Sequence, residues 1–418
     1  MTALERAAST LVLADCGATA PGAPTPETVL LGLPIERRTV LAARRAGFDR
    51  VYVLSGENAA ISPVLEGTGA LAFPREAAEA ALPPGRIVLL PNRIVAGTQW
   101  LASLRETPIQ PGRLHAIGGG TVVETDEPAP LARVLARASS LSSVVAAWGE
   151  VLPAGPPVEG VAAPLEVTGA AQLPAAENLL LQGLVKKEDG VLTRLISRKI
   201  SLAVTRRIAA TRITPNVMTL LTASLGLAAA WSFASPALGR QIAGGLLFLL
   251  HSILDGCDGE LARLKFQESR RGGTLDFWGD NVVHVAVFSA FALAWSAASG
   301  ESWPLLLGAL AVTGTILGAG FVYTYAMRPR QAATGPLLTT VSPTRRSRLT
   351  GILDAVARRD FIYLVAVLSL FGKGYWFLAA AAVGTPAFFL ALVVMALVSR
   401  FGGGAAAATR AASGESAV

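Results

Sequence analysis

The stretch from residue 255 to residue 280 reads DGCDGELARLKFQESRRGGTLDFWGD and contains four aspartates. Asp255 and Asp258 are three positions apart, so they share one face of a helix. Asp276 and Asp280 are four apart and share a face of a second helix. A connection with two adjacent glycines can fold the second helix back beside the first. Because both helices continue into apolar segments, we expect the four carboxylates to converge at one boundary of a membrane.

These carboxylates require a cation. Unpaired carboxylates in a small apolar cluster repel one another and are costly to desolvate. No His or Cys with the spacing of a zinc site accompanies them, and hard oxygen ligands favour Mg²⁺, Mn²⁺ or Ca²⁺ over Zn²⁺. Gly259 and Ala262 keep the same helix face free of bulk, which lets a phosphorylated ligand approach the backbone. Arg263 adds a fixed positive charge that suits phosphate.

The spacing of eight residues in this stretch, D-x2-D-G-x2-A-R-x8-G-x3-D-x3-D, resembles a family signature. It is the signature of the CDP-alcohol phosphotransferases (CDP-alcohol phosphatidyltransferases), integral-membrane enzymes of phospholipid synthesis. A second segment, TPNVMT at residues 214–219, is similar to a sequence that borders the nucleotide site in that family. The resemblance implies a transferase that moves a phosphoryl-alcohol group from a CDP-alcohol donor to an acceptor alcohol and releases CMP. It also implies two Mg²⁺ or Mn²⁺ ions and a homodimer.

The resemblance further implies roles for individual residues. Asp255, Asp258 and Asp276 would be metal ligands. Asp280 would be the general base that takes the proton from the acceptor hydroxyl, and it would also contact a metal. The implied CDP-binding residues are Pro215, Thr219, Asp255, Gly259, Ala262, Arg263 and Gly272. For an acceptor that carries a phosphate, the candidate residues are Arg328, Arg345 and Arg359.

The composition is that of a membrane protein with a soluble part. Of the 418 residues, 52% are hydrophobic and 16% are charged, and the mean hydropathy is +0.50. The formal net charge is +7, but the basic residues gather beside apolar segments. This pattern favours an anionic membrane surface as the partner. We therefore expect contacts with membrane lipids and no nucleic-acid partner.

Six segments are predicted to cross the membrane as helices. They are residues 215–236, 239–262, 276–299, 303–327, 359–373 and 375–399. Most arginines of residues 214–400 lie in the second-to-third and fourth-to-fifth connections, and the positive-inside rule places these connections in the cytoplasm. The chain is therefore predicted to be a multi-pass protein of the inner (cytoplasmic) membrane. Both termini and the aspartate site would face the cytoplasm.

Residues 1–175 have the pattern of a cytoplasmic, Rossmann-type α/β domain. Apolar strands at 11–15, 50–56 and 86–90 alternate with helical segments such as 37–46. This alternation predicts a parallel sheet that is covered on both faces. Residues 114–124 are expected to add a further strand.

The element order resembles a nucleotidyltransferase domain. Such domains are fused to CDP-alcohol phosphotransferases in the bifunctional inositol-phosphate cytidylyltransferase / di-inositol phosphate phosphate synthases. Residues 14–22 lack the basic residue of that family's nucleotide loop, and Asn92 stands where a metal-binding Asp is expected. We therefore expect an inactive domain. The glycines at 118–120 suit a phosphate cradle or, more commonly, a tight turn.

The rest of the chain divides into a linker, a membrane domain and a tail. Residues 176–213 are predicted to be a linker that ends in a basic amphipathic helix along the membrane surface. Residues 214–400 form the predicted membrane domain, and residues 401–418 a disordered tail.

Two other functions remain open. The chain could be a non-enzymatic transporter or scaffold that binds a divalent cation through its carboxylates. It could also be a bifunctional enzyme whose N-terminal domain is an active cytidylyltransferase. The residues do not identify the donor alcohol or the acceptor.

Overall fold

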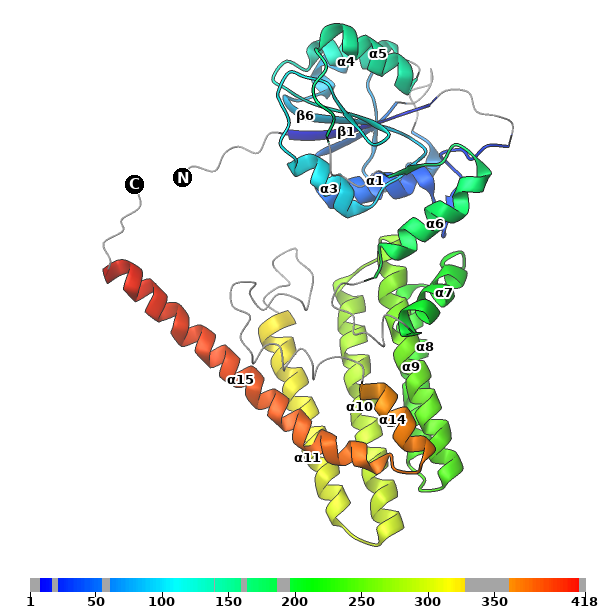
Figure 1. Cartoon of the computed structure of the whole chain (residues 1–418), viewed down its shortest axis with the longest axis vertical. Helices are drawn as coiled ribbons and strands as arrows, with labels where there is room; N and C mark the ends of the chain where they lie inside the picture. Colours follow the sequence, from blue (N-terminus) through cyan, green and yellow to red (C-terminus); the bar gives the residue numbers. More distant parts are fainter. Residues whose placement is uncertain are drawn as a thin grey trace. The chain divides into compact units, whose positions relative to one another are not determined.

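The computed structural model describes residues 8–16, 22–54, 61–138, 140–158, 164–185, 196–327 and 361–412. The chain forms two compact units. One comprises Met1–Leu184 with Leu264–Phe266, and the other comprises Val185–Arg263 with Gln267–Val418. Figure 1 shows that one part contains the sheet and the other is built from long helices.

The first unit contains a mixed six-stranded sheet in the order β5-β4-β1-β6-β9-β8. Strands β5, β4, β1 and β6 are parallel neighbours, whereas β9 pairs antiparallel with both β6 and β8. The α/β class is therefore confirmed, but the prediction of a parallel sheet holds only for four strands. The strands are β1 Ala8–Ala14, β4 Arg50–Val53, β5 Leu71–Ala72, β6 Gly85–Pro91, β8 His115–Ile117 and β9 Gly120–Thr125. Two short pairs accompany them, β2 Val29–Leu30 with β3 Leu33–Pro34 and β7 Ile94–Val95 with β10 Leu165–Glu166.

The antiparallel edge arises from a tight hairpin. The segment 114–124, expected to form one strand, contains both β8 and β9. A connection this short can only join antiparallel strands. Gly119 in the turn has a φ of +84°, and a Cβ on Gly120 would lie 2.1 Å from the carbonyl oxygen of Leu89. The glycine run therefore forms a turn that packs closely against β6.

Helices cover both faces of this sheet (Figure 1). Leu11 and Leu13 of β1 pack with residues of α1 and α3, whereas Val12 and Ala14 pack with residues of α4 and α5. This alternation follows from the two-residue period of a strand. Helix α1 ends at Gly47, in the left-handed conformation, as the sequence predicts. The helices are α1 Ile35–Ala46, α2 Ala78–Ala81, α3 Thr98–Glu106, α4 Ala129–Arg137, α5 Leu141–Val151 and α6 Leu173–Gln182, with 3₁₀ turns at Pro63–Leu65 and Ala170–Gln172.

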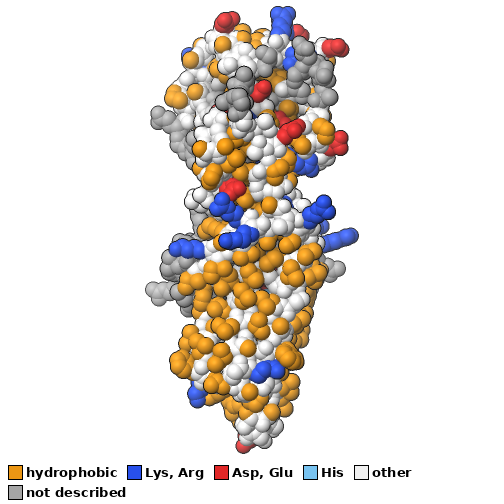
Figure 2. Space-filling view, turned by 90° about the vertical axis from the view of Figure 1, so that its right-hand side faces the viewer, with side chains coloured by type: hydrophobic (Ala, Val, Ile, Leu, Met, Phe, Trp, Pro, Cys, Tyr) orange, Lys and Arg blue, Asp and Glu red, His pale blue; other side chains and the backbone are white. Residues whose placement is uncertain are grey.

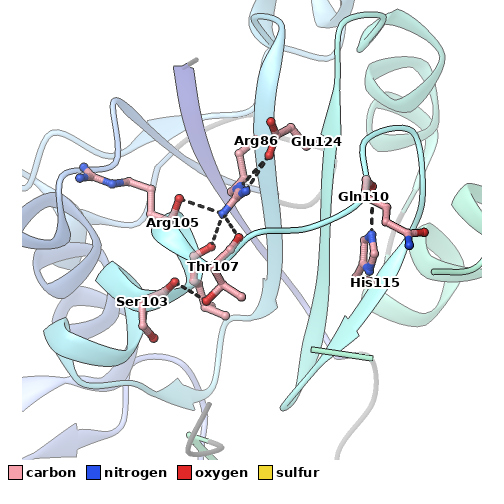
Figure 3. A network of polar contacts seen from close by, with 8 residues as sticks. Arg86, Ser103, Arg105, Thr107, Gln110, His115 and Glu124 are labelled. Carbon is pink, nitrogen blue, oxygen red and sulfur yellow. Dashed lines mark hydrogen bonds and ion pairs between the residues drawn. The ribbon is translucent and has the colours of Figure 1, made fainter. Parts of the chain in front are cut away.

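A buried arginine joins α3 to the sheet. The guanidinium of Arg86 in β6 pairs with the carboxylate of Glu124 in β9 at 2.6 Å (Figure 3). It also donates hydrogen bonds of 2.8–2.9 Å to the carbonyl oxygens of Leu104, Arg105 and Thr107. The last carbonyls of a helix have no intrahelical partners, so Arg86 satisfies groups that would otherwise be costly to bury.

Replacing Arg86 with methionine is expected to destabilise the sheet edge by roughly 2–4 kcal/mol, because buried carbonyls and the Glu124 carboxylate lose their donor. The measurement is hydrogen exchange of the α3 and β6 amides in the full chain. Arg133→Met is the matched control, because the pair of Arg133 with Glu79 is exposed and contributes about 0.5 kcal/mol or less. Equal protection in the two variants would contradict this role for Arg86.

Glu36 in the first turn of α1 makes the stability of the first unit depend on pH. Burial and, to a smaller extent, the charges of Glu27 and Asp15 raise the pKa of Glu36 from 4.5 to about 7. The stabilising effect of the bound proton is complete below pH 4.5 and is lost as the pH rises to about 7.

The variant Glu36→Gln is therefore expected to unfold like the wild type near pH 4. At about pH 8 its free energy of unfolding should be higher, by at most roughly 3 kcal/mol. Hydrogen exchange of α1 and β1 measures the difference, with the exposed Glu66→Gln as control. If the wild type had the higher free energy of unfolding at about pH 8, the prediction would be refuted.

Within its described residues, the second unit contains five helices that are long and apolar enough to cross a membrane. These spans are Pro215–Phe233, Leu238–Lys265, Arg270–Ser299, Trp303–Tyr325 and Tyr375–Leu397. Figure 2 shows hydrophobic side chains covering one face of this helical part, with Lys and Arg side chains gathered at one end of it and sparse toward the other. The chain is thus a multi-pass membrane protein. The helices are α7 Arg198–Ala209, α8 Pro215–Phe233, α9 Leu238–Lys265, α10 Arg270–Ser299, α11 Trp303–Phe321, a π-helix at Val322–Met327, α14 Phe361–Leu370 and α15 Tyr375–Ala412.

The fifth predicted span, 359–373, coincides with α14, which has only ten described residues. Ten helical residues extend about 15 Å, about half of the hydrocarbon thickness of a bilayer. Residues 359 and 360 lie outside the described part. Helix α15 continues to Ala412 and so includes most of the segment 401–418, for which disorder is predicted. This part of the helix contains an Ala-rich run, which has a high helix propensity.

Small residues allow the membrane helices to approach closely. A Cβ on Gly226 of α8 would lie 2.6 Å from Val283 of α10. A Cβ on Gly314 of α11 would lie 2.5 Å from Thr385 of α15, whose hydroxyl donates to a carbonyl of α11. Close backbone approach is the usual basis of helix packing in lipid, where the hydrophobic effect does not drive association. This packing holds α9 and α10, the two helices that carry the aspartates, in the bundle.

Candidate active site

Three of the four aspartates converge. Asp255 of α9 and Asp276 and Asp280 of α10 each offer one carboxylate oxygen, and these oxygens lie within 4.8 Å of one another. Asp255 is 4% exposed, and the other two are half-buried. Three hard oxygen ligands at this spacing fit Mg²⁺ or Mn²⁺, and their mutual repulsion favours a bound cation.

Asp258, the fourth aspartate, is held by a different partner. Its Oδ2 accepts a hydrogen bond of 2.5 Å from the hydroxyl of Thr219 in α8, and its Oδ1 accepts one from the backbone N–H of Gly259. Asp258 is not among the three converging carboxylates. The hydrogen bond from Thr219 thus connects the TPNVMT segment to the aspartate motif.

A cavity of about 260 Å³ adjoins the aspartates. Helix α9 supplies Asp255, Asp258, Gly259 and Arg263 to its wall, and α10 supplies Asp276. Leu249, Ser252, Ile253 and Gly256 of α9 also line the cavity, and the remaining lining residues lie on or beside α7 and α14. The cavity thus lies among four elements of the helical unit. A space of this size suits a small polar molecule or one end of a larger substrate.

Four other residues of the implied CDP site do not line this cavity: Pro215, Thr219, Ala262 and Gly272. Pro215 is the first residue of α8, and the hydroxyl of Thr214 caps that helix by accepting from the N–H of Val217. A Cβ on Gly272 would lie 2.9 Å from Asn216 Oδ1, so Gly272 allows α10 to begin beside α8. Ala262 is buried on α9. The acceptor candidates Arg328, Arg345 and Arg359 all lie outside the described residues.

The motif also contains a charged residue that the sequence reading did not single out. Glu260 of α9 is fully buried. Its Oε1 pairs with Arg198 Nη1 at 2.5 Å and accepts from Ser201 Oγ at 2.7 Å, and its Oε2 accepts from Thr205 Oγ1 at 2.7 Å. All three donors lie on α7 at positions i, i+3 and i+7, which form one helix face. This spacing is visible in the sequence and could have predicted a polar contact on one face of the helix. The basic residues around it instead suggested a helix on the membrane surface.

The buried face of α7 is therefore polar. The sequence predicts a helix that lies along the membrane surface, and Lys199, Arg206 and Arg207 of α7 are exposed. Ser201 and Thr205, by contrast, are buried against α9.

Residues 212–345 match the family described as CDP-alcohol phosphatidyltransferase. The chain is also similar to curated proteins named bifunctional IPC transferase and DIPP synthase. The protein from Archaeoglobus fulgidus is 34% identical over 142 residues, which are 34% of this chain and 28% of that protein. The protein from Rubrobacter xylanophilus is 36% identical over 144 residues, which are 34% of this chain and 32% of that protein. The matched region thus spans less than a third of each relative.

Among solved structures, the chain is similar to the phosphatidylinositol phosphate synthase of Mycobacterium tuberculosis with CDP-DAG bound. The match has 22% sequence identity and a TM-score of 0.32, and it covers 47% of this chain and 94% of that one.

Proposed function

We propose that the protein transfers a phosphoryl-alcohol group from a CDP-alcohol to an acceptor alcohol, because residues 212–345 match the CDP-alcohol phosphatidyltransferase family. The observation that carries the proposal is the convergence of Asp255, Asp276 and Asp280 from two helices beside a cavity. The donor would be of the phosphatidyl or inositol-phosphate type. The transporter alternative accounts for the carboxylates but not for Gly259, Ala262 and Arg263 beside them.

The reaction assigns a task to each side chain. An oxygen of the acceptor hydroxyl bonds to the β-phosphorus of the CDP-alcohol, and the bond from that phosphorus to the bridging oxygen breaks. The hydroxyl proton passes to the Asp280 carboxylate, and the electron pair of the broken bond leaves with CMP. Asp255, Asp258 and Asp276 would hold Mg²⁺ or Mn²⁺, in our proposal as a pair of ions. A metal bound there would supply positive charge that offsets the negative charge of the diphosphate and of the leaving group.

The remaining motif residues bind the nucleotide in this proposal. Arg263 supplies a fixed charge to a phosphate, and Gly259 and Ala262 leave room for CDP beside α9. Pro215 and Thr219 lie in the first turns of α8, and Gly272 lies in the first turn of α10. We propose that they border the nucleotide. Thr219 also keeps the carboxylate of Asp258 in place through its hydrogen bond.

The test is Mg²⁺-dependent release of CMP by the purified full chain in detergent. CDP-diacylglycerol and CDP-inositol are offered separately, each with inositol phosphate, glycerol phosphate or inositol. We expect release with one donor and one acceptor, and none after chelation of the metal. Movement of divalent cations into vesicles without CMP release would instead support a transporter.

Replacing Thr219 with valine is expected to lower kcat/KM for CMP release about tenfold or more. A hydrogen bond to a charged group contributes about 1.5–3 kcal/mol, and the variant leaves the Asp258 carboxylate without this donor. Thr222→Val is the matched control, because Thr222 is buried on the same helix and donates to a backbone carbonyl. Similar rates for the two variants would remove Thr219 from the site.

We further propose that α14 belongs to a sixth span and that the aspartate site and both termini face the cytoplasm. The site end of the bundle carries Lys265, Arg270 and Arg271 in the connection from α9 to α10. The opposite ends of the helices carry an aromatic belt, in which Arg240 lies over the ring of Trp231 at 3.9 Å. The belt residues are Trp231, Trp295, Trp303, Tyr375 and Trp376. A homodimer in the inner membrane, with an inactive nucleotidyltransferase-like domain at residues 1–175, completes the proposal.

A further inference from the structure

We infer that Arg198 of α7 binds the phosphate of a small phosphorylated acceptor, and that Glu260 is the residue that positions Arg198. This inference rests on the proposed transfer reaction and identifies the acceptor class for the same site. It assigns α7 a function that its basic composition did not suggest.

The Glu260 carboxylate is buried, and this burial has an energetic cost. A carboxylate removed from water is costly by several kcal/mol unless its oxygens accept strong hydrogen bonds. Glu260 is fully buried and accepts from three donors, all on α7. A shift of α7 by one turn along α9 would break all three contacts at once. Glu260 therefore sets the register of α7 on α9.

This register places Arg198 in the wall of the cavity. The Arg198 side chain is 12% exposed, and it lines the cavity together with Asp255 and Arg263. A Cβ on Gly256, the neighbour of Asp255, would lie 3.5 Å from Arg198 Nη1. The guanidinium thus lies beside the backbone of the helix segment that carries the first metal-site aspartate. A planar guanidinium beside such a site suits recognition of a phosphate.

Hydroxyl groups line the same cavity as this guanidinium. Ser197 and Tyr363 line the cavity and hydrogen-bond to each other at 2.6 Å. Ser201 and Ser252 line it as well. Hydroxyls together with the guanidinium groups of Arg198 and Arg263 suit a phosphorylated polyol. The volume of about 260 Å³ also suits a small, soluble acceptor.

The position of Arg198 favours the acceptor over the donor nucleotide. Asp258 and Glu260 are two residues apart, so they point to nearly opposite sides of α9. Asp258 contacts α8, which carries Pro215 and Thr219 of the proposed CDP pocket, whereas Glu260 contacts α7. In phosphoryl transfer the attacking and leaving oxygens are roughly in line, on opposite sides of the phosphorus. Asp258, Gly259 and Arg263 line the same cavity as Arg198, so the acceptor would lie next to the donor diphosphate, on its α7 side.

The test compares Arg198→Gln with Arg207→Gln, a matched control on the exposed face of the same helix. The first readout is thermal unfolding of the full chain with Mg²⁺ and increasing inorganic phosphate, which reports phosphate affinity. We expect the apparent Kd for phosphate to rise about tenfold in Arg198→Gln and to stay unchanged in Arg207→Gln. Equal affinity in both variants would overturn the assignment. This readout needs no turnover, so it tests Arg198 even if the wild type releases no CMP. A wild type that releases no CMP would contradict the proposed reaction and would leave the phosphate measurement as the test of Arg198.

The second readout is CMP release with the concentrations of donor and acceptor varied separately. Arg198→Gln and Glu260→Gln are both expected to raise the KM for the phosphorylated acceptor about tenfold, with the donor KM and kcat within about twofold. A purely structural role for Glu260 would lower the active fraction and leave both KM values unchanged. A rise in the donor KM alone would place Arg198 at the CDP diphosphate and would refute the acceptor assignment.

Discussion

The variant Asp280→Asn is expected to release CMP about 10²–10⁴-fold more slowly than the wild type, because an amide cannot take the proton from the acceptor hydroxyl. The amide keeps an oxygen at the same position, next to Asp255 and Asp276. Binding of Mn²⁺ and of CDP should therefore change much less than turnover. Single-turnover CMP release and equilibrium binding of CDP measure the two effects separately.

The control for Asp280 is Glu301→Gln, which removes an exposed carboxylate after α10, far along the chain from the motif. Its turnover should equal that of the wild type. Normal CMP release by Asp280→Asn would exclude Asp280 as the general base. If Asp280→Asn lost the binding of CDP and Mn²⁺ as well as turnover, the main role of Asp280 would be that of a metal ligand.

The variant Asp255→Asn is expected to separate stability from activity. Without metal, the three converging carboxylates repel one another, so removing one charge should leave the metal-free protein at least as stable as the wild type. The same change should abolish the stabilisation by Mg²⁺ and lower CMP release by roughly three orders of magnitude, because the metal site loses its buried ligand.

Thermal unfolding with EDTA and with Mg²⁺, together with CMP release, tests this prediction. Asp126→Asn, in an exposed turn of the first unit, is the matched control and should keep its response to Mg²⁺. If Asp255→Asn retained the full Mg²⁺-induced increase in unfolding temperature, Asp255 would not be a metal ligand.

Local patterns in the sequence predicted the elements and the aspartate motif. Helix α1 ends at Gly47 because only glycine adopts the left-handed conformation there at little cost. Thr214 caps α8 through a contact three residues along the chain. The spacing of Asp276 and Asp280 places both on one helix face, and the structure brings them together. Each of these features depends on neighbours within one or two turns.

Contacts between distant segments account for what the sequence did not predict. The antiparallel edge of the sheet depends on a glycine turn packing beneath the carbonyl of Leu89. Asp258 accepts a hydrogen bond from Thr219, which is 39 residues away. Glu260 occupies a variable position of the motif and finds its partners 55–62 residues earlier, on α7.

The sequence by itself determined the membrane class, the helix pair that carries the carboxylates and the chemistry that such ligands favour. Apolar length, helical period and ligand type are local properties, and they do not depend on how the helices pack. Only the tertiary structure decided which carboxylates meet and which side of the site α7 covers. Those choices follow from burial, since a buried carboxylate such as Glu260 is stable only where the fold supplies its donors.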